Sequence, residues 1–226
     1  MTVTRTQHPM PFTRVELCVF SILEGQLQVL LGRRTGPPFE GQWALPGGVL
    51  RIDLDTGLDQ AAQRVAKERL GLDLQHLQQQ GAIGGSTRDP RAPWALSIVY
   101  RVMTPPDGFQ LKAGKRLEEL KWVPVDQACA DKKLAFDHHL IIGAAVEDLR
   151  AEVDNLRIPF EGLPPAFTLG ELQGTCEVLV GHRLDKSSFR RRLDDRDLVV
   201  PLEGEFRGGA NRPAQLYAAR PKSSTR

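Results

Sequence analysis

Two short segments near the middle of the first half most constrain the fold of this chain. The first is Leu45-Pro46-Gly47-Gly48, and its glycines let the backbone approach a phosphate closely. The second is 58–70, where apolar residues recur at helical spacing and which Gly71-Leu72 follows. The spacing predicts an amphipathic helix whose positions 65, 68 and 69 share one face, because residues three and four apart are neighbours on a helix. Together the turn and the helix are a candidate ligand site.

The two segments resemble the two ends of a Nudix box, with departures at metal-binding positions. That motif is a glycine, five residues, a glutamate, seven residues, then Arg-Glu-aliphatic-x-Glu-Glu-x-Gly-aliphatic. The residues that fit it are Arg64, Glu68, Gly71 and Leu72. Val65 and Arg69 stand where the motif requires glutamates. Gly48 and Arg64 are two positions further apart than in the motif, and the place of the first glutamate falls on Thr56, near Asp53 and Asp55.

The loss of two carboxylates predicts the loss of the metal. Mg²⁺ takes oxygen ligands, valine offers no lone pair, and the permanent charge of Arg69 repels a cation. The same guanidinium is suited to grip a diphosphate through paired hydrogen bonds. We therefore predict a domain that binds the substrate of a Nudix hydrolase without cleaving it. We expect it to require no cofactor, with Mg²⁺ needed only if the domain still hydrolyses that substrate. A purely structural helix, with Leu58, Ala61, Ala62, Val65 and Leu70 on its buried side, is the simpler alternative, but it does not explain the turn before it.

Composition excludes several classes of protein. At 226 residues, with 41% hydrophobic and 26% charged residues, the chain is typical of globular proteins with one large or two small domains. No apolar run approaches the ~18 residues of a membrane span, and the N-terminus lacks an apolar signal core. We expect a cytoplasmic protein that does not contact membranes. The three scattered cysteines, Cys18, Cys129 and Cys176, have no metal-binding spacing and are expected to be buried thiols.

The order of the predicted elements indicates two domains. Strands are expected at 14–22, 27–32, 79–84, 94–103 and 117–123, and helices at 58–70, 125–130 and 136–153. Interleaved in this way they predict an α/β Nudix sandwich, a mixed sheet with flanking helices. We expect a Nudix-like ligand-sensing domain over 1–155, a Pro/Gly-rich linker over 156–167 and a second domain over 168–226.

The second domain has the pattern of a winged helix-turn-helix. Thr168 and Glu171 form a capping box that opens a helix, and Gly181 is placed to end it. Asp185 is placed to cap a second helix over 186–193. Strands are expected at 198–202 and 214–217, on either side of a Gly/Arg-rich loop. Helix, short turn, basic helix and hairpin in this order predict a DNA-binding domain.

The second helix carries the residue types that contact DNA. Small hydroxyls at its N-terminus suit a close approach to phosphates or bases, and arginine is the residue best suited to bidentate contacts with guanine. The candidate DNA-binding residues are Lys186, Ser187, Ser188, Arg190, Arg191 and Arg192 on this helix, with Arg207 and Arg212 on the hairpin tip. Phe189 and Leu193 are expected to face the core. The alternative is a solvated charged face balanced by Asp194, Asp195 and Asp197.

Over nearly its whole length the chain resembles the Nudix-related transcriptional regulators of NAD metabolism, the NrtR family. The segments that carry the resemblance are WALPGG (43–48), RDPR (88–91), LAFDHHLI (134–141), FTLGELQ (167–173), LDKSSFRRRL (184–193) and RPAQLY (212–217). The resemblance implies a repressor of genes for NAD synthesis or salvage, which binds palindromic operators in double-stranded DNA as a homodimer. It also implies that ADP-ribose binds the Nudix domain and releases the DNA.

For such a ligand, candidate binding residues lie around the turn and the box helix. We expect Arg33 or Arg34 and the amides of Gly47 and Gly48 to bind the diphosphate, with Arg64, Glu68 and Arg69 behind them. Arg88 and Arg91 are expected to close over the ligand from their loop. Phe39 or Trp43 is a candidate for stacking on adenine. The alternative is that both are core residues, and for Trp43 the two interpretations carry equal weight. We interpret Phe136-Asp137-His138 as a structural anchor of the long helix rather than as a catalytic group.

Two other functions are compatible with the sequence. An ADP-ribose pyrophosphatase is one, because Glu68, Asp53 and Asp55 leave some carboxylates near the box. The winged helix is also compatible with binding a protein rather than DNA. A metal-dependent turnover assay distinguishes the first alternative, and a steep salt dependence of binding distinguishes the second.

Overall fold

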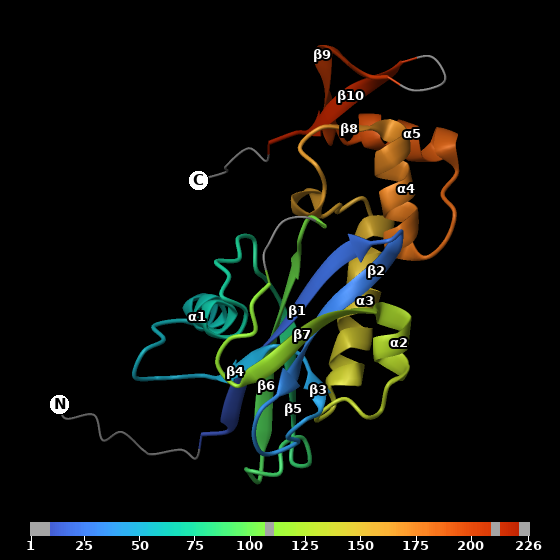
Figure 1. Cartoon of the computed structure of the whole chain (residues 1–226). Helices are drawn as coiled ribbons and strands as arrows, with labels where there is room; N and C mark the ends of the chain where they lie inside the picture. Colours follow the sequence, from blue (N-terminus) through green and yellow to red (C-terminus); the bar gives the residue numbers. More distant parts are fainter. Residues whose placement is uncertain (1–9, 107–110, 209–212, 222–226) are drawn as a thin grey trace, which may run out of the picture. The chain divides into compact units, whose positions relative to one another are not determined.

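A seven-stranded sheet organises the first two thirds of the chain in the computed structural model (Figure 1). The structure describes residues 10–106, 111–208 and 213–221. The sheet is built around β1 (Phe12–Leu23), and its strand order is β3-β2-β1-β6-β5, with β4 paired to β1 and β7 to β2. The other strands are β2 (Gln26–Arg34), β3 (Trp43–Ala44), β4 (Gly47–Val49), β5 (Gln78–Gly85), β6 (Ala95–Met103) and β7 (Leu117–Pro124). The predicted α/β sandwich is confirmed.

The two faces of β1 have different roles because side chains alternate along a strand. Val15 and Leu17 are fully buried and pack with α1 (Leu58–Leu70), which contributes Ala62 and Val65 to the same core. On the other face, Arg14 and Glu16 are charged and also buried. Figure 1 shows α1 on one side of the sheet and α2 (Val125–Ala130) on the other. The sheet thus has an apolar face under α1 and a polar patch on its opposite face.

Most of the predicted elements lie within a few residues of their predicted positions, and the segment 35–48, for which no helix or strand was predicted, is one place where they differ. We expected no regular structure there, but it contains β3 and most of β4. Both strands are very short, so no periodic pattern marks them, and they exist because β2 and β1 pair with them. Gly47 and Gly48 are therefore part of the sheet. Cys129 is half-buried rather than buried, while Cys18 and Cys176 are buried free thiols as expected.

The described chain divides into two compact units. One contains residues 10–19, 29–102 and 111–143, and the other contains 20–28, 103–106 and the described residues from 144 onward. The division falls inside α3 (His138–Asp154), which is one continuous helix. None of the helices in the described ranges is long and apolar enough to cross a membrane.

The C-terminal region of the second unit contains two helices and a three-stranded sheet. Helix α4 (Leu169–Val180) and helix α5 (Lys186–Asp195) are joined by a short turn that begins at Gly181, whose φ of 78° favours glycine. The sheet has the order β8-β10-β9, formed by β8 (Phe167–Thr168), β9 (Val199–Arg207) and β10 (Ala214–Ala219). A single-turn 3-10 helix, Phe160–Gly162, precedes it. The predicted winged helix-turn-helix is confirmed.

The predicted capping box at Thr168 is formed, and its contribution to the stability of the protein can be measured. The Glu171 amide donates to the Thr168 hydroxyl (3.1 Å), and the Thr168 amide donates to the Glu171 carboxylate (2.8 Å). Replacing Thr168 with alanine leaves one helix amide without its acceptor, so we expect the free energy of unfolding to fall by about 1 kcal/mol. Urea unfolding of the full chain measures this. Thr168→Ser keeps the hydroxyl and should retain most of the stability; an equal loss in both variants would contradict the capping role.

Candidate ligand site and nucleic-acid interface

The acid that partners Arg64 is Asp55 rather than a group at Thr56. The Arg64 guanidinium donates from Nε to Asp55 Oδ1 (2.7 Å) and from Nη2 to Asp55 Oδ2 (2.8 Å). These hydrogen bonds are the main reason why the pKa of Asp55 lies below its usual value. Thr56 bonds to Gln60 instead. Arg64 also donates to Glu68 (3.4 Å), so both predicted ligand-binding residues have partners within the box.

Arg69 lies between the box helix, the Gly47 turn and the segment before β7. Its Nε donates to the Gly47 carbonyl (2.7 Å) and its Nη1 to the Lys115 carbonyl (2.6 Å). The amides of Gly114 and Lys115 in turn donate to the carbonyls of Arg69 and Glu68 at the end of α1. Burial lowers the pKa of Arg69, and the nearby Glu68 opposes this. The guanidinium is thus fixed at a position where the motif has a carboxylate.

These residues do not fit a divalent cation. Val65 offers no ligand atom, and its methyl group packs so closely on Gly48 that a Cβ there would lie 2.8 Å from it. The Gly47 carbonyl already accepts from Arg69. Within the described ranges, no group of three or more His, Cys, Asp or Glu residues is arranged to hold a metal ion. The geometry favours an anionic ligand at the Nudix box.

Five arginines from five separate segments converge on a small cavity at this turn. They line the cavity, of about 30 Å³, together with Leu45, Gly47 and Val49. We call them the arginine cluster: Arg14, Arg34, Arg69, Arg91 and Arg116. Arg14 comes from β1, Arg34 from the end of β2, Arg91 from the loop before β6 and Arg116 from the residue before β7. Guanidinium groups donate hydrogen bonds and accept none, so these five side chains bring only donors to the cavity.

The arginine cluster carries more positive charge than its carboxylate partners balance. Arg14 is paired with Glu16 (2.7 Å) and Arg91 with Asp89 (2.5 Å). Arg34 and Arg69 donate to backbone carbonyls, and the Arg116 side chain has no hydrogen-bond or ion-pair partner in the described part of the chain. Burial, with the neighbouring charges of Arg14 and Arg91, lowers the pKa of Arg34 to about 10. An anion such as a diphosphate would relieve this repulsion.

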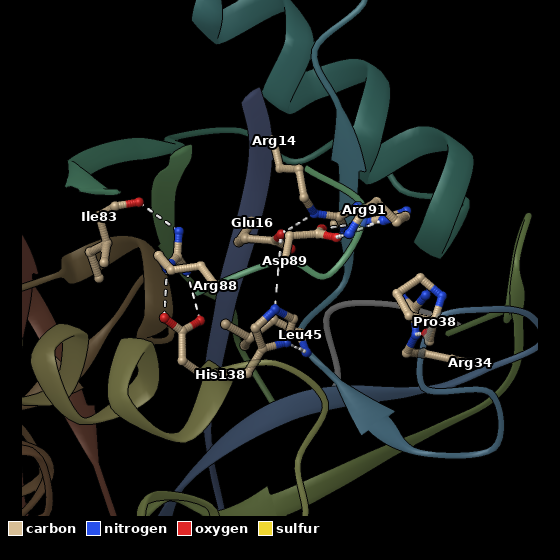
Figure 2. A network of polar contacts seen from close by, with 12 residues as sticks. Arg14, Glu16, Arg34, Pro38, Leu45, Ile83, Arg88, Asp89, Arg91 and His138 are labelled. Atoms are coloured by element: carbon tan, nitrogen blue, oxygen red, sulfur yellow. Dashed lines mark hydrogen bonds and ion pairs between the residues drawn. The ribbon is translucent and has the colours of Figure 1, made fainter. Parts of the chain in front are cut away.

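Polar contacts also anchor the start of α3, and Figure 2 shows them beside Arg14, Arg34 and Arg91 of the arginine cluster. Arg88 donates from Nε and Nη2 to the two carboxylate oxygens of Asp137 (2.6 and 2.7 Å) and from Nη1 to the Ile83 carbonyl. The Leu45 amide donates to Nδ1 of the buried His138 (2.9 Å). These contacts agree with the structural role expected for Phe136-Asp137-His138. Arg88 is therefore engaged with the helix and does not line the cavity of the arginine cluster.

The remaining predicted ligand residues lie outside this cavity, except for Gly47. Arg33 points to Glu118 (3.0 Å) and to the Gly41 carbonyl. Lys121 Nζ lies 4.0 Å from the centroid of the Trp43 ring. Phe39 packs edge-on against Phe136, with ring centroids 4.7 Å apart. Of the predicted arginines, the structure brings together Arg34, Arg69 and Arg91.

Sequence reasoning missed Arg14 and Arg116, and also the carboxylates Glu16 and Asp89. A signal for two of them was present: Arg14 and Glu16 alternate with apolar residues in a strand that is otherwise buried. Charged residues at alternate positions of such a strand mark a buried polar face. Arg116 carried no local signal, since it lies in a turn and has a φ of 64°.

On the second unit, α5 presents an exposed basic face. Phe189 and Leu193 are buried, as predicted, and this orients the helix. Lys186, Ser187, Arg190 and Arg191 are exposed and lie three or four residues apart, so they share the outer face. Neither the Arg190 nor the Arg191 side chain has a hydrogen bond or ion pair with another described residue. Both guanidinium groups are available to a partner.

The other candidate DNA-binding residues differ in their burial and in the contacts that they make with the rest of the chain. Arg192 donates to the Asp154 carbonyl (2.5 Å) and is half-buried. Arg207 is paired with Glu171 of the capping box and donates to the Ala166 carbonyl. Ser188 donates its amide to the capping Asp185 and is half-buried. Arg212 lies outside the described residues.

The fold and the site together define a Nudix domain followed by a winged helix. Residues 13–143 match the NUDIX domain model, and residues 159–219 match the model of the NrtR DNA-binding winged helix domain. The chain is 36% identical, over 94% of its length and 84% of the relative's, to the ADPR responsive transcriptional repressor NtrR of Acinetobacter baylyi. The chain belongs to the NrtR family, which confirms the resemblance seen in the sequence.

Solved structures and a second curated relative extend this comparison. Shewanella oneidensis NrtR complexed with a 27mer DNA has a TM-score of 0.78 and 31% identity, covering 92% of this chain and 93% of that one. The NUDIX domain of the same protein complexed with ADP ribose has a TM-score of 0.56 and 28% identity, over 63% of this chain and 90% of that domain. An ADP-ribose pyrophosphatase of Methanocaldococcus jannaschii is 33% identical over 56% of this chain and 70% of its own length.

The buried His138 predicts how stability depends on pH. Burial lowers the pKa of His138 to about 4, below the value of roughly 6.5 for an unfolded chain. Between these values the unfolded chain binds a proton that the folded chain does not, so stability falls as pH falls through this window. From pH 7 to pH 5 we expect this group to lower the free energy of unfolding by about 2 kcal/mol.

Urea unfolding at the two pH values, with His138→Gln as the matched variant, isolates the contribution of this side chain. The variant should lose less stability on acidification than the wild-type protein. NMR shifts of the His138 ring protons should stay constant from pH 7 to pH 5. A titration midpoint near 6.5 in the folded protein would contradict the prediction.

Proposed function

We propose that this protein is a DNA-binding transcriptional repressor that a nucleotide releases from its operator. The observation that carries the proposal is the arginine cluster, which stands at the Nudix box where metal-binding carboxylates are missing. The cluster supplies donors for a diphosphate, and α5 supplies free arginines for DNA. The effector is ADP-ribose or a close relative, in keeping with the names of the A. baylyi repressor and of the S. oneidensis complex.

The same proposal includes the partners and the setting. The protein acts in the cytoplasm as a homodimer on a palindromic operator in double-stranded DNA, because two-fold protein symmetry matches two-fold symmetry of half-sites. It controls genes of NAD synthesis or salvage, as the family does. The sensing domain covers 1–155, the linker 156–167 and the DNA-binding domain 168–226. No cofactor is required, and Mg²⁺ matters only if hydrolysis is retained.

The central experiment is a fluorescence anisotropy titration with DNA from upstream of the neighbouring genes, with and without ADP-ribose. We expect tight, salt-sensitive binding that ADP-ribose abolishes. Binding that ADP-ribose does not change would exclude this effector, and an absence of binding to every such promoter would overturn the repressor assignment.

A hydrolase is the second candidate, favoured by the similarity to the M. jannaschii pyrophosphatase and by the acidic residues that remain at the box. The site geometry argues against it, since Arg69 and Val65 do not fit a divalent cation. An assay in which the protein is incubated with ADP-ribose and Mg²⁺ or Mn²⁺, with detection of AMP, distinguishes a hydrolase from a repressor without turnover. Turnover that Glu68→Gln abolishes would locate hydrolysis at the box.

Arg116 offers a clean test of the ligand site, because truncating its side chain breaks no hydrogen bond to another described residue. We expect Arg116→Ala to weaken ADP-ribose binding by about tenfold, as the loss of one charged hydrogen bond does. Operator binding without ligand should not change. The matched control is Arg33→Ala, which removes an arginine of the same unit that lies outside the arginine cluster. Calorimetry measures both, and equal affinities in the two variants would contradict the site.

Arg190 and Arg191 test the DNA interface. Each single alanine variant should weaken operator binding and lower the slope of log K against log salt by ~0.9 for each phosphate that is no longer neutralised. ADP-ribose affinity should remain at the wild-type value. Lys132→Ala removes the same charge from an exposed site in the first unit and serves as the control. A salt slope that is the same in all variants would favour a protein partner over DNA.

A further inference from the structure

The C-terminal end of α3 takes hydrogen-bond donors from outside the helix, because the last four carbonyls of a helix have no partner within it. The chain that follows supplies the first of these donors. The Arg157 amide donates to the Glu152 carbonyl (2.8 Å), and the Leu156 amide donates to the Val153 carbonyl (2.8 Å). Leu156 has a left-handed φ of 58°. This is a Schellman motif, which ends the helix and leaves the next two carbonyls to other donors.

Two arginines at the C-terminal end of α5 supply donors to those two carbonyls. Arg192 Nη2 donates to the Asp154 carbonyl (2.5 Å), and Arg196 Nη1 donates to the Asn155 carbonyl (2.7 Å). A positive charge is also favoured here because the C-terminal end of a helix is the negative end of its dipole. His182 Nε2, in the turn between α4 and α5, lies 3.3 Å from a carboxylate oxygen of Asp154. The turn and the second helix of the helix-turn-helix thus contact the same end of α3, within the second unit.

These contacts lie on a different side of α5 from its outer basic face. Arg192 and Arg196, the residue that caps α5, are four positions apart and therefore share one side of the helix. Arg192 also follows the buried Phe189 by three positions, so its side chain leaves the helix close to the buried face. It is half-buried, whereas Arg190 and Arg191 are exposed. One pair of arginines holds the helix, and the other pair is accessible to DNA.

We propose that Arg192 and Arg196 are positioning residues for operator recognition. They fix α5 on the end of α3 and so set the direction in which Arg190 and Arg191 reach the DNA. The inference rests on the proposed function and gives Arg192 a role other than the DNA contact expected from the sequence. Paired hydrogen bonds to base edges require a set orientation, whereas attraction to phosphates follows mainly from charge. Loss of the two contacts with α3 should therefore affect sequence-specific binding more than non-specific binding.

Fluorescence anisotropy on the full chain tests this role with two probes, an operator fragment that the wild-type protein binds and a fragment of unrelated sequence. We expect Arg192→Ala to weaken operator binding by about tenfold, which corresponds to the loss of one paired base contact. Binding to the unrelated fragment should stay within about twofold, and the slope of log K against log salt should keep its wild-type value, because no phosphate contact is lost.

Two further variants and one contrast complete the test. Arg192→Lys keeps a charged donor for the Asp154 carbonyl and should restore most of the operator affinity. Arg196→Ala removes the second contact with α3 and should weaken operator binding in the same selective way. Arg191→Ala removes an arginine from the outer face instead, so its salt slope should fall by ~0.9 for each phosphate that is no longer neutralised.

Three results would overturn the proposal. One is an operator affinity that Arg192→Ala leaves unchanged. Another is a salt slope that Arg192→Ala lowers by ~0.9, which would make Arg192 itself a phosphate contact. The third is an equal weakening of binding to both fragments, because a loss of folded protein reduces both alike. If the wild-type protein binds no promoter fragment, the proposed function itself fails.

Discussion

The guanidinium of Arg69, held by two backbone carbonyls beside the Gly47 turn, is the group on which the candidate ligand site depends. An arginine remains charged at any physiological pH, so this position attracts anions and repels cations permanently. The same side chain joins α1 to the segment before β7, whose amides bond back to the last carbonyls of that helix. Arg116 is the next residue of that segment. The group that replaces a metal ligand therefore also places a second cation at the site.

How much of the structure could be predicted from the sequence depends on how far apart in the chain the interacting residues lie. The α1, α4 and α5 helices, the capping box at Thr168 and the left-handed Gly181 follow from local patterns and lie where the sequence placed them. The arginine cluster does not, because its members come from five segments that only the folded sheet brings together. β3 and β4 were missed because strands of two and three residues have no period to detect.

Within the box, residue counting falls on Thr56, which is not an acid, and leaves Asp53 and Asp55 as the nearby carboxylates. Asp55 reaches Arg64 with both carboxylate oxygens, and no count along the chain distinguishes it from its neighbours. The RDPR loop shows a similar limit. Its two arginines have the same chemistry and are three residues apart, yet Arg91 lines the cavity and Arg88 binds Asp137. The conformation of the loop decides which of the two arginines lines the cavity and which one binds Asp137.

That division within one short loop connects two parts of the first unit. Arg88 donates two hydrogen bonds to Asp137, the residue immediately before α3. This helix has 17 residues and is roughly 25 Å long. Because Arg88 and Arg91 are separated by only two residues, the same short loop both lines the cavity and binds the residue before this helix. The wall of the cavity and the start of this helix are thus joined through the ion pair of Arg88 with Asp137.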